Sequence, residues 1–115
     1  MAEDKKYNGW TNYETWNVAL WLGNDSGSQE RCEELTQAAW NDAEADKTFT
    51  REERATLDLA DALKAEIEEF APDLGASMFS DLLSAALGEV NWYEIAEHYI
   101  ADLDKTSDED EAEAE

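Results

Sequence analysis

The sequence contains few basic residues. It holds 8 Lys and Arg against 30 Asp and Glu among 115 residues, which gives a formal net charge of −22 at pH 7. Proteins that bind DNA, RNA or anionic membranes neutralise phosphates with Lys and Arg, so this balance argues against all three ligands. A partner that recognises this chain by its charge is therefore expected to be basic.

Cysteine and long apolar runs are also scarce. The single cysteine, Cys32, excludes an internal disulfide, and no run of about 18 apolar residues is present that could cross a bilayer. Residues 1–6 carry four charged side chains and are not followed by the apolar segment of a signal peptide. We therefore expect a protein of the reducing cytoplasm.

Residues that commonly carry out catalysis are few. The chain has one histidine, one cysteine and no glycine-rich phosphate loop, so we predict neither an enzyme nor a bound cofactor. His98 lies four residues after Glu94 and directly after Glu97, which could place metal ligands on one helix face. A di-iron bundle requires two Glu-x-x-His elements, and the chain has none. We predict no metal site and expect His98 at a helix interface.

Apolar residues, in contrast, are abundant enough for a folded domain. They make up 43% of the chain and include five Trp, four Tyr and three Phe, which acidic disordered segments lack. They recur at three- and four-residue spacing without strict alternation, which indicates helices and not strands. We predict an all-α, compact single-domain bundle of about five helices over residues 1–103, followed by a disordered acidic tail over residues 104–115.

Capping patterns and apolar spacing place the helices. The first has so wide an apolar face that we expect it at the centre of the domain, with Trp16 and Trp21 in the core. The third has the clearest apolar stripe, and the fourth is expected to pack on it. The stripe consists of Leu59, Leu63, Ile67 and Phe70. The first, second, third and fifth helices are expected to start at Thr11, Ser28, Thr50 and Asn91. The first, third and fourth are expected to end near Gly23, before Pro72 and at Gly88.

Acidic residues belong to the predicted folded body as well as to the tail. Residues 1–103 hold 23 acids and 7 bases, a net charge of −16. Carboxylates held in rows on rigid helices could imitate the phosphates of a short DNA duplex and pair with Lys and Arg in a DNA-binding cleft. The candidate phosphate surrogates lie on the second and third predicted helices and are Glu30, Glu33, Glu34, Asp58, Asp61, Glu66 and Glu69.

The same acidity has a simpler interpretation. Excess Asp and Glu keep proteins soluble and are general in salt-adapted proteomes, where the charges need only be spread evenly. Trp10, Trp40 and Trp92 lie at the edges of predicted helices and could provide the apolar patch of a homodimer, which would double the length of a mimicked duplex.

The segment Gly9–Leu22, with the sequence GWTNYETWNVALWL, resembles the start of a group of small proteins encoded by phages and plasmids. Residues 80–100 show a weaker likeness to the same group. This resemblance implies a mobile-element setting and no particular activity. In size, acidity and helical content the chain is also similar to phage DNA-mimic anti-restriction proteins of the overcome-classical-restriction family. Such proteins, like some acidic anti-CRISPR proteins, occupy the DNA-binding surface of a defence complex.

Two functional hypotheses follow from the sequence. The first is an acidic DNA mimic that blocks a restriction-modification or CRISPR complex in the host cytoplasm by occupying its DNA-binding surface. The alternative is a small non-enzymatic phage or plasmid adaptor that binds a protein partner through its Trp-rich N-terminal helix. Raising the ionic strength should weaken the first kind of complex steeply and change the second little.

Overall fold

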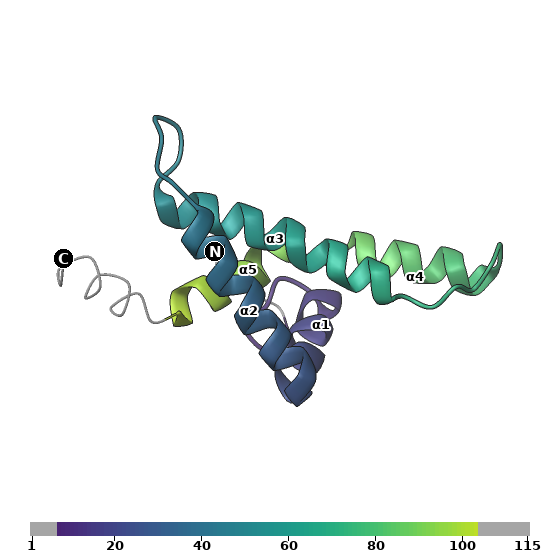
Figure 1. Ribbon diagram of the computed structural model, residues 1–115. Helices are drawn as coiled ribbons and strands as arrows, with labels where there is room; N and C mark the ends of the chain where they lie inside the picture. The colour runs from purple at the N-terminus through teal and green to yellow at the C-terminus, as the bar shows by residue number, and fades with distance from the viewer. Residues whose placement is uncertain (1–6, 104–115) are drawn as a thin grey trace.

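Five helices make up the fold in the computed structural model, which describes residues 7–103 (Figure 1). No strand occurs within that range, so the predicted all-α class is confirmed. None of the five helices combines the length and the apolar character needed to span a membrane. The predicted tail, residues 104–115, lies outside the described residues. The helices are α1 (Tyr13–Asn24), α2 (Ser26–Asp42), α3 (Arg51–Phe70), α4 (Met78–Gly88) and α5 (Trp92–Asp102).

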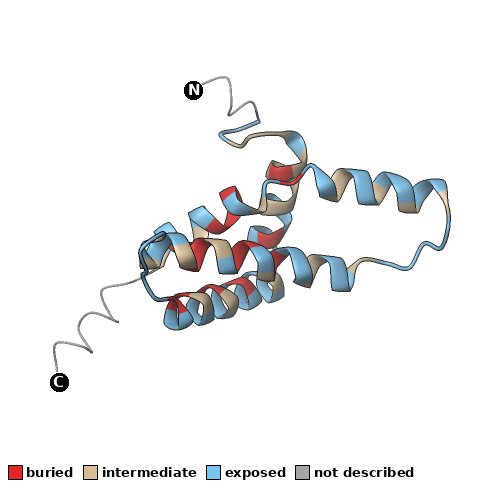
Figure 2. Cartoon of the chain, turned by 90° about the horizontal axis from the view of Figure 1, so that it is seen from above, coloured by how far each residue is buried: buried red, intermediate tan, exposed pale blue. Residues whose placement is uncertain are grey.

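The core lies where α2, α3 and α5 meet (Figure 2). From α3, Leu59 and Leu63 are at most 1% exposed, and from α5, Ile95 and Ile100 are completely buried. Burying one such aliphatic side chain stabilises the fold by roughly 1.5–3 kcal/mol, so these residues contribute strongly to holding the three helices together.

α1 lies at the edge of this core, and the expectation that it would be central was wrong. Only Thr15 and Leu22 of α1 are buried, whereas Leu20 is 40% and Trp21 68% exposed. Trp16 is half-buried. α1 is apolar around much of its circumference, but it packs against α2 and α5 on one side only, so Tyr13, Leu20 and Trp21 are exposed to solvent.

The tryptophans expected at helix edges also differ from the prediction. Trp40 is only 8% exposed and belongs to the core, so it offers no surface for self-association. Trp10 and Trp92 are half-buried and pack against the same core. The three side chains therefore do not form the exposed apolar patch that the sequence suggested.

The first two helices begin at residues other than the predicted ones. Asn12 caps α1, with its Oδ1 accepting the N–H of Thr15 at 2.9 Å, so the predicted cap at Thr11 was wrong. Asp25 caps α2 by accepting the N–H of Ser28 at 2.9 Å, and Ser28 itself is inside the helix. In both places an Asn or Asp, which caps at least as well as Ser or Thr, stands a few residues from the predicted cap.

The start and end of α3 agree with the prediction. Thr50 and Glu53 form a reciprocal capping box, with N–H to side-chain oxygen distances of 2.9 and 3.0 Å. The helix ends at Phe70, before Pro72, whose ring disfavours helical geometry in the preceding residue. These local sequence features therefore fix the length of α3 at 20 residues.

α3 is longer than the helices that pack on it. Along its apolar stripe, Leu59 and Leu63 are buried, Ile67 is half-buried and Phe70 is 75% exposed. Figure 2 shows α4 and the end of α3 projecting together from the core, with mostly exposed surface. α4 was expected to pack on α3, but the two helices border a shallow groove and no residue of α4 is buried.

Candidate interaction surfaces

The start of the motif Gly9–Leu22 forms a tight turn against α5. Asn8 and Gly9 have positive φ angles of 49° and 91°, as a two-residue hairpin turn of type I′ requires. The backbones of Tyr7 and Trp10 exchange hydrogen bonds of 3.0 and 2.7 Å across this turn. The ring of Trp10 then lies against His98, with centroids 4.2 Å apart. His98 itself is exposed, and its neighbour Trp10 lies in the turn before α1, so the contact is not the helix interface that the sequence suggested.

The buried carboxylate of Glu94 also holds this motif. Its Oε1 accepts the N–H of Thr11 at 3.1 Å, and the residue is only 2% exposed. The predicted capping box at Asn91 is therefore half present: the Asn91 side chain accepts the N–H of Glu94 at 3.1 Å, while the Glu94 side chain reaches the N-terminal segment. No group of three or more His, Cys, Asp or Glu residues in the described range is arranged to hold a metal ion.

Two of the seven candidate carboxylates bind an arginine of the protein itself. Arg31 donates to both carboxylate oxygens of Glu66 at 2.9 and 3.3 Å and to Glu34 at 3.3 Å. The hydrogen bonds to Glu66 and Glu34 raise the pKa of Arg31. The side chain of Glu66 is only 20% exposed. Glu66 therefore has less charge to offer a partner than the sequence suggested.

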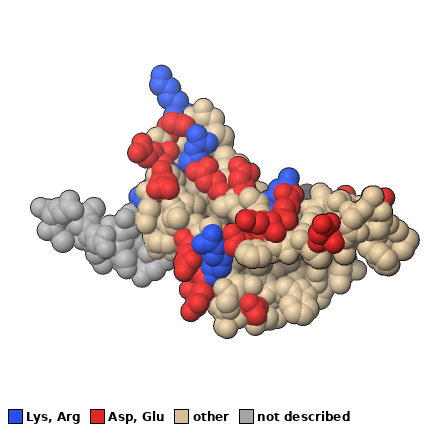
Figure 3. Space-filling model, turned by 45° about the vertical axis from the view of Figure 1, so that its right-hand side comes forward, with Lys and Arg blue, Asp and Glu red and all other residues tan. Residues whose placement is uncertain are grey.

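The other candidates point to different parts of the surface. Glu33 lines a cavity between α2 and α5, whereas Glu69 lines a groove between α2 and α3. Asp58 and Asp61 lie on the exposed side of α3 and form no ion pair with a described residue. Glu30 is exposed on α2. On the face that Figure 3 shows, the acidic side chains form several groups with cations among them.

Most of the cations in the described range are directed at the protein's own groups. The guanidinium of Arg51 lies 4.1 Å from the ring centre of Trp40 and donates to the Trp40 carbonyl at 2.9 Å. Arg54 lies over Phe49, with 5.6 Å between the guanidinium carbon and the ring centre. With Arg31 bound to carboxylates, the exposed cations of residues 7–103 are chiefly two lysines, Lys47 and Lys64. The 21 carboxylates of this range therefore dominate the surface field.

A second surface is apolar and was not identified from the sequence. It comprises five exposed side chains at the end of α3, in the α3–α4 connection and on α4, which we call the apolar arm: Phe70 (75%), Leu74 (39%), Met78 (64%), Phe79 (62%) and Leu82 (60%). A groove of about 740 Å³ between α2 and α3, floored by Leu35, Leu63 and Ile67, leads to Phe70. Exposed apolar patches of this kind mark interaction sites in soluble proteins.

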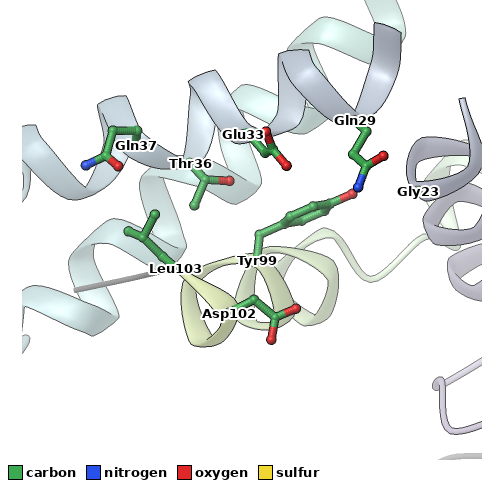
Figure 4. Close-up of a pocket in the computed structure, with 8 residues that line it drawn as sticks. All are labelled: Gly23, Gln29, Glu33, Thr36, Gln37, Tyr99, Asp102 and Leu103. Atoms are coloured by element: carbon green, nitrogen blue, oxygen red, sulfur yellow. The ribbon is translucent and has the colours of Figure 1, made fainter. Parts of the chain in front are cut away.

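The cavity between α2 and α5 contains no activated nucleophile. It has a volume of about 430 Å³, and Tyr99 points across it from α5 toward α2 (Figure 4). Burial raises the pKa of the Tyr99 phenol above its ordinary range and also raises the pKa of the nearby Cys32 thiol. Both groups are therefore protonated at neutral pH, and neither is prepared to attack a substrate.

Comparison with known proteins provides a family but no activity. Neither the curated proteins nor the solved structures gave a match to the chain. The profile of a family of unknown function, DUF7249, matches residues 3–113. The match covers nearly the whole chain, and the protein therefore belongs to this family of unknown function.

Proposed function

We propose that this protein is a non-enzymatic acidic inhibitor that binds the DNA-binding surface of a basic host protein or complex. The observation that carries the proposal is the excess of 21 acidic over 5 basic residues within residues 7–103, with three of the five cations directed at internal partners. The negative electrostatic field of this excess charge accelerates and favours association with a basic cleft. The proposed targets are restriction-modification or CRISPR complexes in the host cytoplasm.

The structure suggests which carboxylates would contact the target. Asp58 and Asp61 are exposed on α3 and are not neutralised by a described cation. They are therefore better phosphate surrogates than Glu66, which is paired with Arg31. Because the acidic groups lie on several sides of the domain, we propose occupancy of the cleft through a broad negative field with local contacts, and not through two continuous phosphate-like rows.

An infection assay tests this proposal. Bacteria with an active restriction or CRISPR system would express the full chain, and the plating of an unmodified target phage would be compared with that on cells without it. We expect plating to rise about tenfold or more, because a defence complex occupied by the protein cannot bind the phage DNA. The double variant Asp58→Asn, Asp61→Asn should lose much of this effect.

A matched control removes the same number of charges elsewhere. The variant Asp81→Asn, Glu89→Gln alters exposed acids of α4 and its C-cap and should retain the inhibition. Unchanged plating with the wild-type chain on restriction and CRISPR hosts would count against the proposal. Equal activity of the two double variants would show that the α3 carboxylates are not the contact residues.

The adaptor hypothesis is kept because of one observation. Trp21 is 68% exposed on α1, next to Leu20 at 40%, and Tyr13 on the same helix is 47% exposed. Exposed Trp and Tyr residues are common anchors of protein interfaces. A complex formed through these side chains should persist at high salt and be lost in Trp21→Ala, whereas a complex formed by the acidic residues should dissociate at high salt and tolerate that variant.

A further inference from the structure

We propose that the apolar arm is a self-association surface through which two copies of this chain pair. The inference is independent of the inhibitor proposal, because it uses none of the acidic residues assigned there. It starts from two exposed aromatic rings, Phe70 at the last position of α3 and Phe79 in the first turn of α4. Met78 and Leu82 of α4 are exposed as well.

α4 has too little support within one copy. It has 11 residues, none of them buried, and isolated helices shorter than about 12–15 residues are only marginally stable in water. Ser77 caps it by accepting the N–H of Ser80 at 3.1 Å, but a cap contributes only about 1 kcal/mol. An amphipathic helix of this length is stabilised mainly by burial of its apolar face. Here Leu83 and Leu87 are only half-buried, and Met78, Phe79 and Leu82 are exposed.

The charge distribution indicates what covers the arm. Residues 70–88 contain two acids, Asp73 and Asp81, and no base, which makes them nearly neutral in a chain of net charge −22. Residues 15–24 of α1 carry no charge, so the chain has two lightly charged regions at which two acidic copies can approach with little repulsion. Of these two regions, the arm has the larger number of exposed apolar side chains. A basic partner would be attracted to the acidic faces instead. Residues 104–115 hold no large apolar side chain and cannot supply the cover.

The size and shape of the arm also suit a symmetric pair. By their sizes and exposed fractions, the five side chains present on the order of 600 Å² of surface, close to the roughly 800 Å² that each partner buries in a standard interface. In a two-fold arrangement, the α3–α4 pair of one copy would lie on that of the other as a four-helix unit.

Sedimentation equilibrium of the full chain tests the proposal. We expect a monomer–dimer equilibrium with a Kd in the micromolar range, tightened by added salt because salt screens the repulsion between the acidic bodies. The double variant Phe79→Glu, Leu82→Glu should weaken dimerisation at least about tenfold, since it places four charges in the interface of a dimer. The matched control Ala38→Glu, Ala101→Glu adds the same two charges at exposed positions of α2 and α5, outside the arm, and should dimerise like the wild type.

Hydrogen exchange of the unmodified protein provides a second measurement that does not depend on a variant. Amides of α4 should exchange more slowly as the protein concentration rises through the dimer range. A wild-type chain that stays monomeric at about 200 µM, well above a micromolar Kd, would overturn the proposal. So would a dimer in which the protection of α4 does not change, or a folded Phe79→Glu, Leu82→Glu variant that still dimerises.

Discussion

The hydroxyl oxygen of Thr15 accepts a hydrogen bond from the backbone N–H of Asn91 at 2.8 Å, across 76 residues of sequence. Thr15 is completely buried, and Asn91 is the cap of α5. The first N–H groups of a helix have no hydrogen-bond partner within the helix. The Thr15 side chain of α1 thus supplies the acceptor for one such N–H at the start of α5. The side chain of Asn12 adds a second link by donating to the carbonyl of Glu89 at 2.8 Å.

We predict that Thr15→Val lowers the free energy of unfolding by about 1–2 kcal/mol, because the shape is kept while the acceptor is lost. Thr36→Val is the matched control: Thr36 is also buried, but its hydroxyl donates at 2.6 Å to the Cys32 carbonyl of its own helix. Removing such a bond should change stability by less than about 0.5 kcal/mol. Urea unfolding followed by circular dichroism measures both, and equal losses would contradict the prediction.

The sequence predicted the helices well where local chemistry determines them. The Thr50–Glu53 capping box and Pro72 define α3 within a few neighbouring residues, so spacing alone located its ends. Burial was less predictable, because it depends on how far neighbouring helices extend along each other. The stripe that begins with Leu59 continues to Phe70, but the partner helices end earlier, and the last residue is exposed.

The candidate sites show the same limit. The sequence gives the number of charges, but the ion pair between Arg31 and Glu66 joins residues 35 positions apart on two helices, and their spacing gives no sign of it. The apolar arm was read as core because an amphipathic pattern does not show whether a partner face exists in the same chain. The distribution of charges does not single it out either, because residues 70–88 hold two acids while residues 15–24 hold none.

The cap of α2 should make stability depend on pH. Hydrogen bonds from the backbone and side chain of Ser28 lower the pKa of Asp25. A group with a lowered pKa in the folded state stabilises the protein above its ordinary pKa, and this contribution is lost as the pH falls through the lowered value. Asp25→Asn keeps an acceptor oxygen but does not titrate. We therefore expect the wild type to be more stable than Asp25→Asn at pH 7.

The informative quantity is the difference in stability between the wild type and Asp25→Asn at each pH. Acid also neutralises the other carboxylates of a chain of net charge −22, which relieves repulsion in both proteins alike. Thermal unfolding from pH 7 down to about pH 3 should show the advantage of the wild type shrinking with acid. An advantage that is constant or grows toward low pH would refute the assignment of the effect to the Asp25 carboxylate.

Arg31→Gln should strengthen the proposed inhibition. The substitution removes a cation from the acidic surface and releases Glu34 and Glu66 to pair with a basic target. Lys64→Gln changes the net charge equally without releasing a carboxylate from a described ion pair, so its gain should be smaller. Phage plating on restricting hosts measures both. A folded Arg31→Gln variant that inhibits less than the wild type would mean that the ion pair organises the binding surface.

The reactivity of Cys32 should report the opening of the core. The thiol is 2% exposed, and burial raises its pKa, so alkylation by iodoacetamide at neutral pH should require a transient opening of the fold. If opening is global, Thr15→Val should accelerate alkylation by about five- to thirtyfold, in proportion to its lost stability. Cys32 also lines the groove between α2 and α3, which offers a direct route to the sulfur. Equal alkylation rates in the wild type and Thr15→Val would favour that route, because entry through the groove does not depend on the bond between α1 and α5.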